Sequence, residues 1–151
     1  MSFCLWITGL PGSGKSTILN ELSRMLFEAG VEFIPLSLDQ IRTVLTPEPK
    51  YSDQERVLVY RSLALMAQQL VELGDKNVII DATGNRKEFR DLARGLIPEF
   101  AEIYVKWPLE LCKAREASRQ SILVQKNLYK RASEGTLGGE LPGISAPYEE
   151  P

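Results

Sequence analysis

Short apolar runs alternate along this chain with longer segments whose apolar residues recur at helical spacing. The runs cover residues 3–8, 31–38, 78–80 and 101–107, and they have the near-continuous hydrophobicity of strands that are buried on both faces. Strands that alternate with helices predict a parallel sheet with helices on both faces. We therefore predict an α/β fold of three layers, α/β/α, with a sheet of four or possibly five strands. The predicted helices are 15–29, 41–45, 53–73, 87–96, 108–116 and 119–130.

The same patterns predict which side chains form the core. In the first predicted helix, one apolar face is expected to be buried. Both tryptophans lie in predicted strands, and both cysteines lie in apolar patterns, so we expect all four side chains to pack in the interior. The expected core residues in these groups are Ile18, Leu22, Met25, Leu26, Ala29, Trp6, Trp107, Cys4 and Cys112.

Length and composition limit the possible chemistry. The 151 residues predict one domain, and 18 basic against 20 acidic residues leave a net charge of -2, which disfavours binding to nucleic acid or membrane by bulk charge. No apolar run approaches the roughly 20 residues that span a bilayer, and the early Gly/Pro turn does not fit a signal peptide. We expect a cytoplasmic location. With no histidine and two cysteines, catalysis must rely on carboxylates, lysine, arginine and backbone amides.

A phosphate-binding motif follows the first predicted strand. Residues 9–16, GLPGSGKS, fit the pattern G-x-x-x-x-G-K-[ST] between a strand and a helix. The glycines let backbone amides converge on phosphate oxygens, Lys15 is expected to reach the β- and γ-phosphates, and the Ser16 hydroxyl is expected to bind Mg²⁺. The alternative is a glycine-rich turn that binds nothing. The predicted ATP-binding residues here are Gly9, Gly12, Ser13, Gly14, Lys15, Ser16 and Thr17.

Two aspartates end predicted strands at the sheet edge where ligands bind in such folds. Asp81 is a candidate to hold Mg²⁺, and the alternative is a turn aspartate before Gly84. Asp39 can orient an acceptor hydroxyl or take its proton, and Arg42 can pair with an anionic acceptor. The alternative for this pair is a helix N-cap followed by a solvated arginine.

A basic cluster occupies the last quarter of the chain. A basic segment that closes over ATP would stabilise developing charge and exclude water. A solvated amphipathic helix is the alternative explanation. The cluster consists of Lys113, Arg115, Arg119, Lys126, Lys130 and Arg131.

The second half of the chain resembles the adenylylsulfate kinase family of P-loop kinases. The segments that carry the resemblance are 105–115 (VKWPLELCKAR), 128–132 (LYKRA) and 143–149 (GISAPYE), in the family's order. The resemblance implies a single P-loop kinase domain over 1–151, with a basic helical lid at roughly 117–141. It also implies phosphoryl transfer from MgATP to the 3′-hydroxyl of adenylylsulfate. A homodimer is the assembly that we consider for this protein. The final strand and helix of the family have no counterpart here.

The resemblance implies roles for individual residues. Asp39 would orient or deprotonate the acceptor hydroxyl, and the ring of Tyr51 would stack on the adenine of the acceptor. Arg115 would lie against the adenine of ATP. The implied acceptor-binding residues are Arg42, Tyr51, Arg56, Lys130 and Leu141, of which Lys130 and Leu141 belong to the lid.

Several positions depart from the family pattern on the acceptor side. Ser37 replaces an aspartate, Val59 replaces an asparagine, and Leu141 replaces the phenylalanine that stacks on adenylylsulfate. Residues 81–87, DATGNRK, differ from the family's SFISPYR, and the chain between Arg115 and Leu128 is longer than usual. Two alternatives therefore stay open: a kinase for another nucleotide-like or sugar-like hydroxyl compound, and an ATP-binding regulatory protein with little activity.

Overall fold

The computed structural model describes residues 1–118, 128–134, 141–144 and 146–151. Strands and helices alternate through the first two thirds of the chain, as the hydrophobic pattern predicts. In chain order the elements are β1 (Cys4–Thr8), α1 (Lys15–Glu28), β2 (Phe33–Ser37), α2 (Leu38–Leu45), α3 (Asp53–Glu72), β3 (Asn77–Asp81), α4 (Lys87–Leu96), β4 (Phe100–Tyr104), α5 (Leu109–Ala117) and α6 (Leu128–Ser133).

The strands of the described residues form one parallel sheet in the order β2-β3-β1-β4. The predicted parallel α/β architecture is therefore confirmed, with four strands. Ile7 of β1 pairs with Asp81 of β3, and Ser37 of β2 pairs with the same Asp81. The register therefore brings the phosphate loop, Asp81 and the start of α2 together at the carboxyl edge of the sheet.

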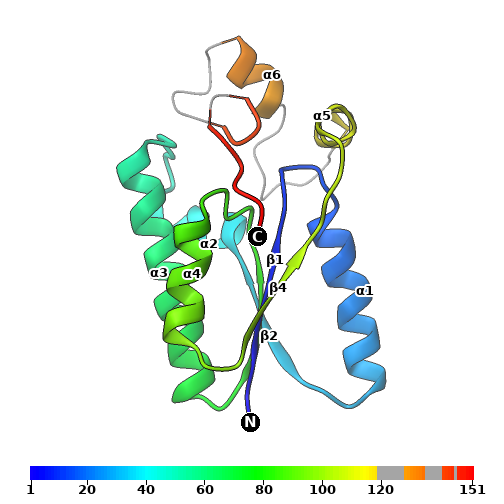
Figure 1. Cartoon of the computed structure of the whole chain (residues 1–151), viewed down its shortest axis with the longest axis vertical. Coiled ribbons are helices and arrows are strands. Elements are labelled where there is room, and N and C mark those ends of the chain that lie inside the picture. Colours follow the sequence, from blue (N-terminus) through cyan, green and yellow to red (C-terminus); the bar gives the residue numbers. More distant parts are fainter. Residues whose placement is uncertain (119–127, 135–140, 145) are drawn as a thin grey trace.

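Helices cover both faces of the sheet. Figure 1 shows α2, α3 and α4 on one face and α1 on the other. The main core lies on the side of α3 and α4, where Trp6 stacks on Tyr60 and Tyr60 stacks on Phe89, with ring centroids 6.0 Å and 4.4 Å apart. Trp6 and Cys4 are fully buried there, and Cys112 is buried in a second, smaller cluster, as predicted.

The prediction for the first helix was only partly right. Leu22 and Leu26 are half-buried, but Ile18 and Met25 are 40% and 55% exposed, and Ala29 is exposed as well. None of the described residues of α1 is fully buried. The apolar spacing predicted the helix correctly. Among the described residues, α1 packs on β1 and β3 of the sheet, and much of its apolar surface stays exposed.

The structure contradicts the predicted burial of Trp107 and the alternative of an N-cap at Asp39. Trp107 is 42% exposed because β4 ends at Tyr104, so Trp107 lies in the connection beyond the strand. Asp39 is not an N-cap, because α2 begins at Leu38 with Ser37 as its N-cap, which places Asp39 in the first turn. Of the predicted lid, 119–127 and 135–140 lie outside the described residues.

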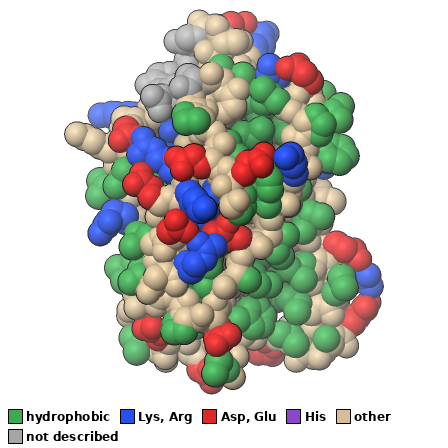
Figure 2. Space-filling view, viewed as in Figure 1, with side chains coloured by type: hydrophobic (Ala, Val, Ile, Leu, Met, Phe, Trp, Pro, Cys, Tyr) green, Lys and Arg blue, Asp and Glu red, His purple; other side chains and the backbone are tan. Residues whose placement is uncertain are grey.

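Ion pairs connect α4, β4 and the C-terminal residues. The face in Figure 2 carries a central band in which basic and acidic side chains alternate, and hydrophobic side chains flank it on the side of α1. Glu102 of β4 pairs with Arg94 and with the fully buried Arg90, and Lys106 pairs with Glu150.

In the part of the chain that the structure describes, no helix is both long and apolar enough to cross a membrane.

Candidate active site

The phosphate loop is held in shape by glycines and by the helix that it packs against. Gly12 and Gly14 have φ angles of +78° and +102°, which L side chains rarely adopt. A Cβ on Gly12 would lie 2.2 Å from the backbone oxygen of Cys112, so α5 touches the loop directly. Lys15 opens α1, and its Nζ donates hydrogen bonds to the backbone oxygens of Gly9 and Leu10 at 3.0 Å and 3.1 Å. The ammonium group therefore lies across the loop.

A hydroxyl and a carboxylate meet beside this loop. The Ser16 Oγ donates a hydrogen bond to Asp81 Oδ2 at 2.9 Å, which joins the start of α1 to the end of β3. Oxygen ligands of this kind suit Mg²⁺, which is usually bound in phosphate sites by one or two carboxylates together with water and substrate phosphates. The described residues contain no group of three or more His, Cys, Asp or Glu side chains that could form a metal cage. A set of one serine and one aspartate fits an ion shared with a nucleotide.

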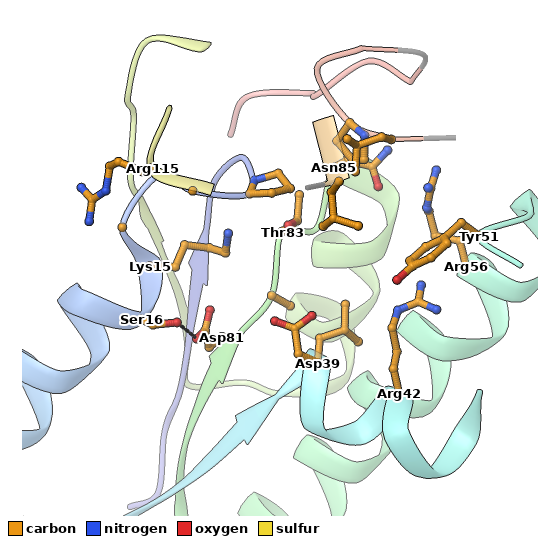
Figure 3. Close-up of a pocket in the computed structure, with 18 of the residues that line it drawn as sticks. Lys15, Ser16, Asp39, Arg42, Tyr51, Arg56, Asp81, Thr83, Asn85 and Arg115 are labelled. Carbon is orange, nitrogen blue, oxygen red and sulfur yellow. Dashed lines mark hydrogen bonds between the residues drawn. The ribbon is translucent and has the colours of Figure 1, made fainter. Parts of the chain in front are cut away.

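The loop opens into a cavity of about 510 Å³, a size typical of small-molecule sites. Figure 3 shows Lys15, Ser16 and Asp81 on one side, with Asp39, Arg42, Tyr51 and Arg56 on the other. Of the predicted site residues, the cavity is lined by Gly12, Gly14, Lys15, Ser16, Thr17, Asp39, Arg42, Tyr51, Arg56, Asp81, Arg115 and Leu141.

Three predicted site residues are not among the described residues that line the cavity. Gly9 and the buried Ser13 belong to the loop but face its interior side, where a Cβ on Gly9 would meet Ser13 Oγ at 2.7 Å. Lys130 is exposed on α6 and borders a separate, shallower hollow. The structure therefore does not bring Lys130 to the cavity.

The acceptor side of the cavity carries two arginines and an aromatic ring. The guanidinium of Arg42 lies over the ring of Tyr51, 5.1 Å from its centroid. Burial raises the pKa of Tyr51, although the nearby Arg42 acts in the opposite direction. Arg56, on α3, is 4% exposed and lines the same wall. The carboxylate of Asp39 lies in the same half of the cavity as these two cations and the ring.

Arg115 lies at the opposite end, next to the phosphate loop. A Cβ on Gly14 would lie 3.2 Å from its Nη1, and its guanidinium lies 5.9 Å from the centroid of the Trp107 ring. The pair forms a flat, cationic surface beside the start of α1. A planar cation of this kind stacks well on a nucleotide base.

The base of the predicted lid is fastened to the phosphate loop. The Tyr129 hydroxyl donates to the backbone oxygen of Pro11 at 2.8 Å. The amide of Leu128 donates to Glu116 Oε1 at 2.9 Å, which links α6 to α5. Both contacts are buried, so the first turn of α6 has a fixed position relative to the loop.

Sequence reasoning missed the wall formed by residues 83–85. Thr83 and Asn85 line the cavity. The sequence showed only that this segment departs from the family pattern, and it did not predict a role for these two residues. Thr8 Oγ1 donates to the backbone oxygen of Thr83, and Asn85 Nδ2 donates to that of Pro147. Their position directly after Asp81, at the carboxyl end of a strand, was the available signal. Val59, by contrast, is a core residue and does not reach the cavity.

A phosphate loop on a parallel sheet, with a serine–aspartate pair and a cavity lined by several charged side chains beside it, is the arrangement of a P-loop kinase. The sequence profile described as adenylylsulphate kinase matches residues 1–151, and the chain belongs to this family. The family predicted from the sequence motifs is therefore confirmed.

Individual relatives agree with this assignment. An adenylyl-sulfate kinase of Bacillus velezensis is 41% identical over 156 residues, which cover 99% of this chain and 72% of that protein. The Mycobacterium tuberculosis APS kinase CysC, solved in complex with AMPPNP and APS, superposes with a TM-score of 0.82 at 30% identity, covering 99% of this chain and 83% of that one. A sugar kinase of Janibacter sp. superposes with a TM-score of 0.63 at 25% identity, covering 96% and 83%.

Proposed function

We propose that this protein is an adenylylsulfate kinase that transfers the γ-phosphoryl group of MgATP to the 3′-hydroxyl of adenylylsulfate. The observation that carries the proposal is the division of one cavity into two halves. Lys15, Ser16 and Asp81 lie on the phosphate side, and an aromatic ring and two arginines lie on the other. Adenylylsulfate offers a base for the ring and two anionic groups for the guanidinium groups.

The chain's own residues supply positioning and charge. Lys15 and the backbone amides of 12–17 bind the phosphates of ATP, and Arg115 lies against its adenine. Ser16 and Asp81 would hold Mg²⁺, which would supply positive charge that stabilises the phosphate groups of ATP. Asp39 orients the acceptor hydroxyl and accepts its proton as the oxygen attacks the γ-phosphorus. The bond between the γ-phosphorus and the oxygen that bridges it to the β-phosphate breaks, and ADP leaves.

Two lid residues complete the proposed acceptor site. Leu141 lines the cavity and is 3% exposed, which allows it to cover the acceptor without an aromatic stacking surface. Lys130 reaches the phosphates only if the basic segment closes over them. We expect a cytoplasmic enzyme that can form a homodimer, with neither membrane nor nucleic acid as a partner.

The direct test is a coupled assay of ADP release from MgATP with adenylylsulfate as the acceptor. We expect acceptor-dependent turnover that Asp39→Asn lowers by about two orders of magnitude, as removal of a general base does. Asp91→Asn, an exposed aspartate on α4, is the matched control and should keep wild-type rates. Release of ADP that adenylylsulfate does not increase contradicts the proposal.

A different acceptor is the second candidate, and the wall at Thr83 and Asn85 is the observation that favours it. This wall differs from the family pattern, and the Janibacter structure described as a sugar kinase has the same fold. A panel of nucleotide and sugar acceptors with γ-labelled ATP separates the two candidates. Transfer to any small acceptor excludes the third possibility, a regulatory ATP-binding protein.

A further inference from the structure

Glu55 lies behind the acceptor half of the cavity and holds two of its parts. It is the third residue of α3, and it is not among the described residues that line the cavity. Its Oε2 accepts a hydrogen bond from Arg42 Nη1 at 3.2 Å and another from the amide of Tyr51 at 2.8 Å. Its Oε1 accepts from the amide of Lys50 at 2.9 Å. One carboxylate therefore joins α2, the loop before α3 and α3 itself.

The backbone at Tyr51 needs such support. Tyr51 has a φ of +53°, a left-handed conformation that is unfavourable for a residue with a side chain. The hydrogen bonds from the amides of residues 50 and 51 to Glu55 hold the chain in this turn. The hydroxyl of Ser52 accepts from the amide of Glu55 at 3.2 Å and fixes the start of α3. The ring of Tyr51 is thereby aimed at the cavity from a strained turn.

Arg42 depends on the same carboxylate. The side chains of Arg42 and Glu55 are 10% and 14% exposed, so the ion pair is largely removed from water. Arg42 and Arg56 lie near each other in the cavity wall (Figure 3). The negative charge of Glu55 next to Arg42 offsets the repulsion between these two cations. Partial burial acts to raise the pKa of Glu55, but the amides of Lys50 and Tyr51 and the charge of Arg42 outweigh it and lower the pKa.

We infer that Glu55 is a positioning residue for the acceptor, acting through Arg42 and Tyr51 without touching either substrate. The inference rests on the proposed acceptor roles of those two residues. The hydrogen bonds of Glu55 described above go to Arg42 and to residues 50–52, and none goes to the phosphate loop or to Arg115. We therefore expect Glu55 to affect acceptor binding and to leave ATP binding unchanged.

The experiment measures KM for adenylylsulfate and for ATP in Glu55→Gln. Glutamine keeps the shape and one acceptor oxygen but loses the charge and the second oxygen. We expect KM for the acceptor to rise about tenfold or more, as loss of hydrogen bonds to a charged group does, with KM for ATP unchanged. Glu88→Gln removes another carboxylate paired with an arginine, Arg86, on the exposed side of α4, and should change neither constant.

A double variant distinguishes positioning from simple stabilisation. In an Arg42→Ala background, Glu55→Gln should raise the acceptor KM much less than it does alone, because its main partner is gone. A lower melting temperature with both KM values unchanged, or a parallel rise in both, overturns the inference. The inference is also overturned if Glu55→Gln raises the acceptor KM by the same factor in the Arg42→Ala background as in the wild type.

The same experiment separates this inference from the proposed function. If wild-type protein does not phosphorylate adenylylsulfate, the proposed function fails, and the acceptor found by the panel replaces it in the same KM comparison. If the wild type is active and Glu55→Gln keeps a normal acceptor KM while Arg42→Ala does not, only the role of Glu55 fails.

Discussion

The hydroxyl of Ser16 donates a hydrogen bond to the carboxylate of Asp81 across 2.9 Å, and this contact joins the phosphate loop to the end of β3. The two residues lie 65 positions apart in the chain, and only the parallel pairing of β1 with β3 brings them together. The contact places two oxygen ligands of the kind Mg²⁺ prefers at the edge of the ATP site.

Replacement of Asp81 tests this contact. We expect Asp81→Asn to lower kcat about a hundredfold and to increase the Mg²⁺ concentration needed for half-maximal rate, because the amide carries no charge to hold the ion. Initial rates over a Mg²⁺ titration measure both effects. Asp75→Asn, at the opposite edge of the sheet, is the control. An unchanged Mg²⁺ requirement in Asp81→Asn removes this residue from the metal site.

Trp107 provides an optical probe of the ATP site. It is 42% exposed beside Arg115, whereas Trp6 is fully buried. We expect MgATP to change the emission of Trp107, because a base that stacks on Arg115 alters the surroundings of the indole ring. Steady-state fluorescence during an ATP titration measures this change. The response should disappear in Trp107→Phe and persist in Trp6→Phe, and the opposite pattern contradicts the placement of the adenine.

Arg90 is predicted to stabilise the wall around Asn85. It is fully buried, pairs with Glu102, and donates to the backbone oxygens of Gly84 and Glu149. Arg90→Met removes a positive charge that pairs with the buried carboxylate of Glu102. It should therefore lower the free energy of unfolding by about 3–5 kcal/mol. Arg94→Met, whose side chain is 46% exposed, should lower it by about 1 kcal/mol or less. Urea unfolding measures both, and equal losses contradict the prediction.

The fully buried thiol of Cys4 predicts a loss of stability in alkali. Burial raises its pKa from 9.0 to about 12. The unfolded chain therefore releases this proton above pH 9, whereas the folded protein retains it up to about pH 12. The contribution to stability is fully present below pH 9, and it falls by about 1.4 kcal/mol per pH unit between pH 9 and 12. Denaturant unfolding across this range should decline less steeply in Cys4→Ala, and identical slopes contradict the prediction.

Local patterns were sufficient to predict much of the fold and the phosphate side of the site. The apolar runs predicted the four strands, and the motif at residues 9–16 predicted the loop, because both depend on neighbouring residues. The Ser16–Asp81 pair followed from a general property of parallel sheets, whose carboxyl ends share one edge.

The rest depends on contacts between distant segments. Nothing in the pattern around Trp107 shows that the strand ends at Tyr104, and helical spacing in α1 does not reveal what covers its outer face. The role of Glu55 requires knowledge that α2 packs against the start of α3, since Glu55 looks like an ordinary surface residue in the sequence and nothing there pairs it with Arg42. Thr83 and Asn85 line the cavity in a segment that forms hydrogen bonds to the distant residues Thr8 and Pro147.

The contact between Gly12 and Cys112 gives this glycine a second reason to lack a side chain. A methyl group there would collide with the backbone oxygen of Cys112 on α5, at 2.2 Å. The two segments can therefore change only in concert: a residue larger than glycine in the loop requires α5 to move outward, and α5 carries Arg115 with it. A substitution at Gly12 thus disturbs the recognition of the nucleotide base as well as that of its phosphates.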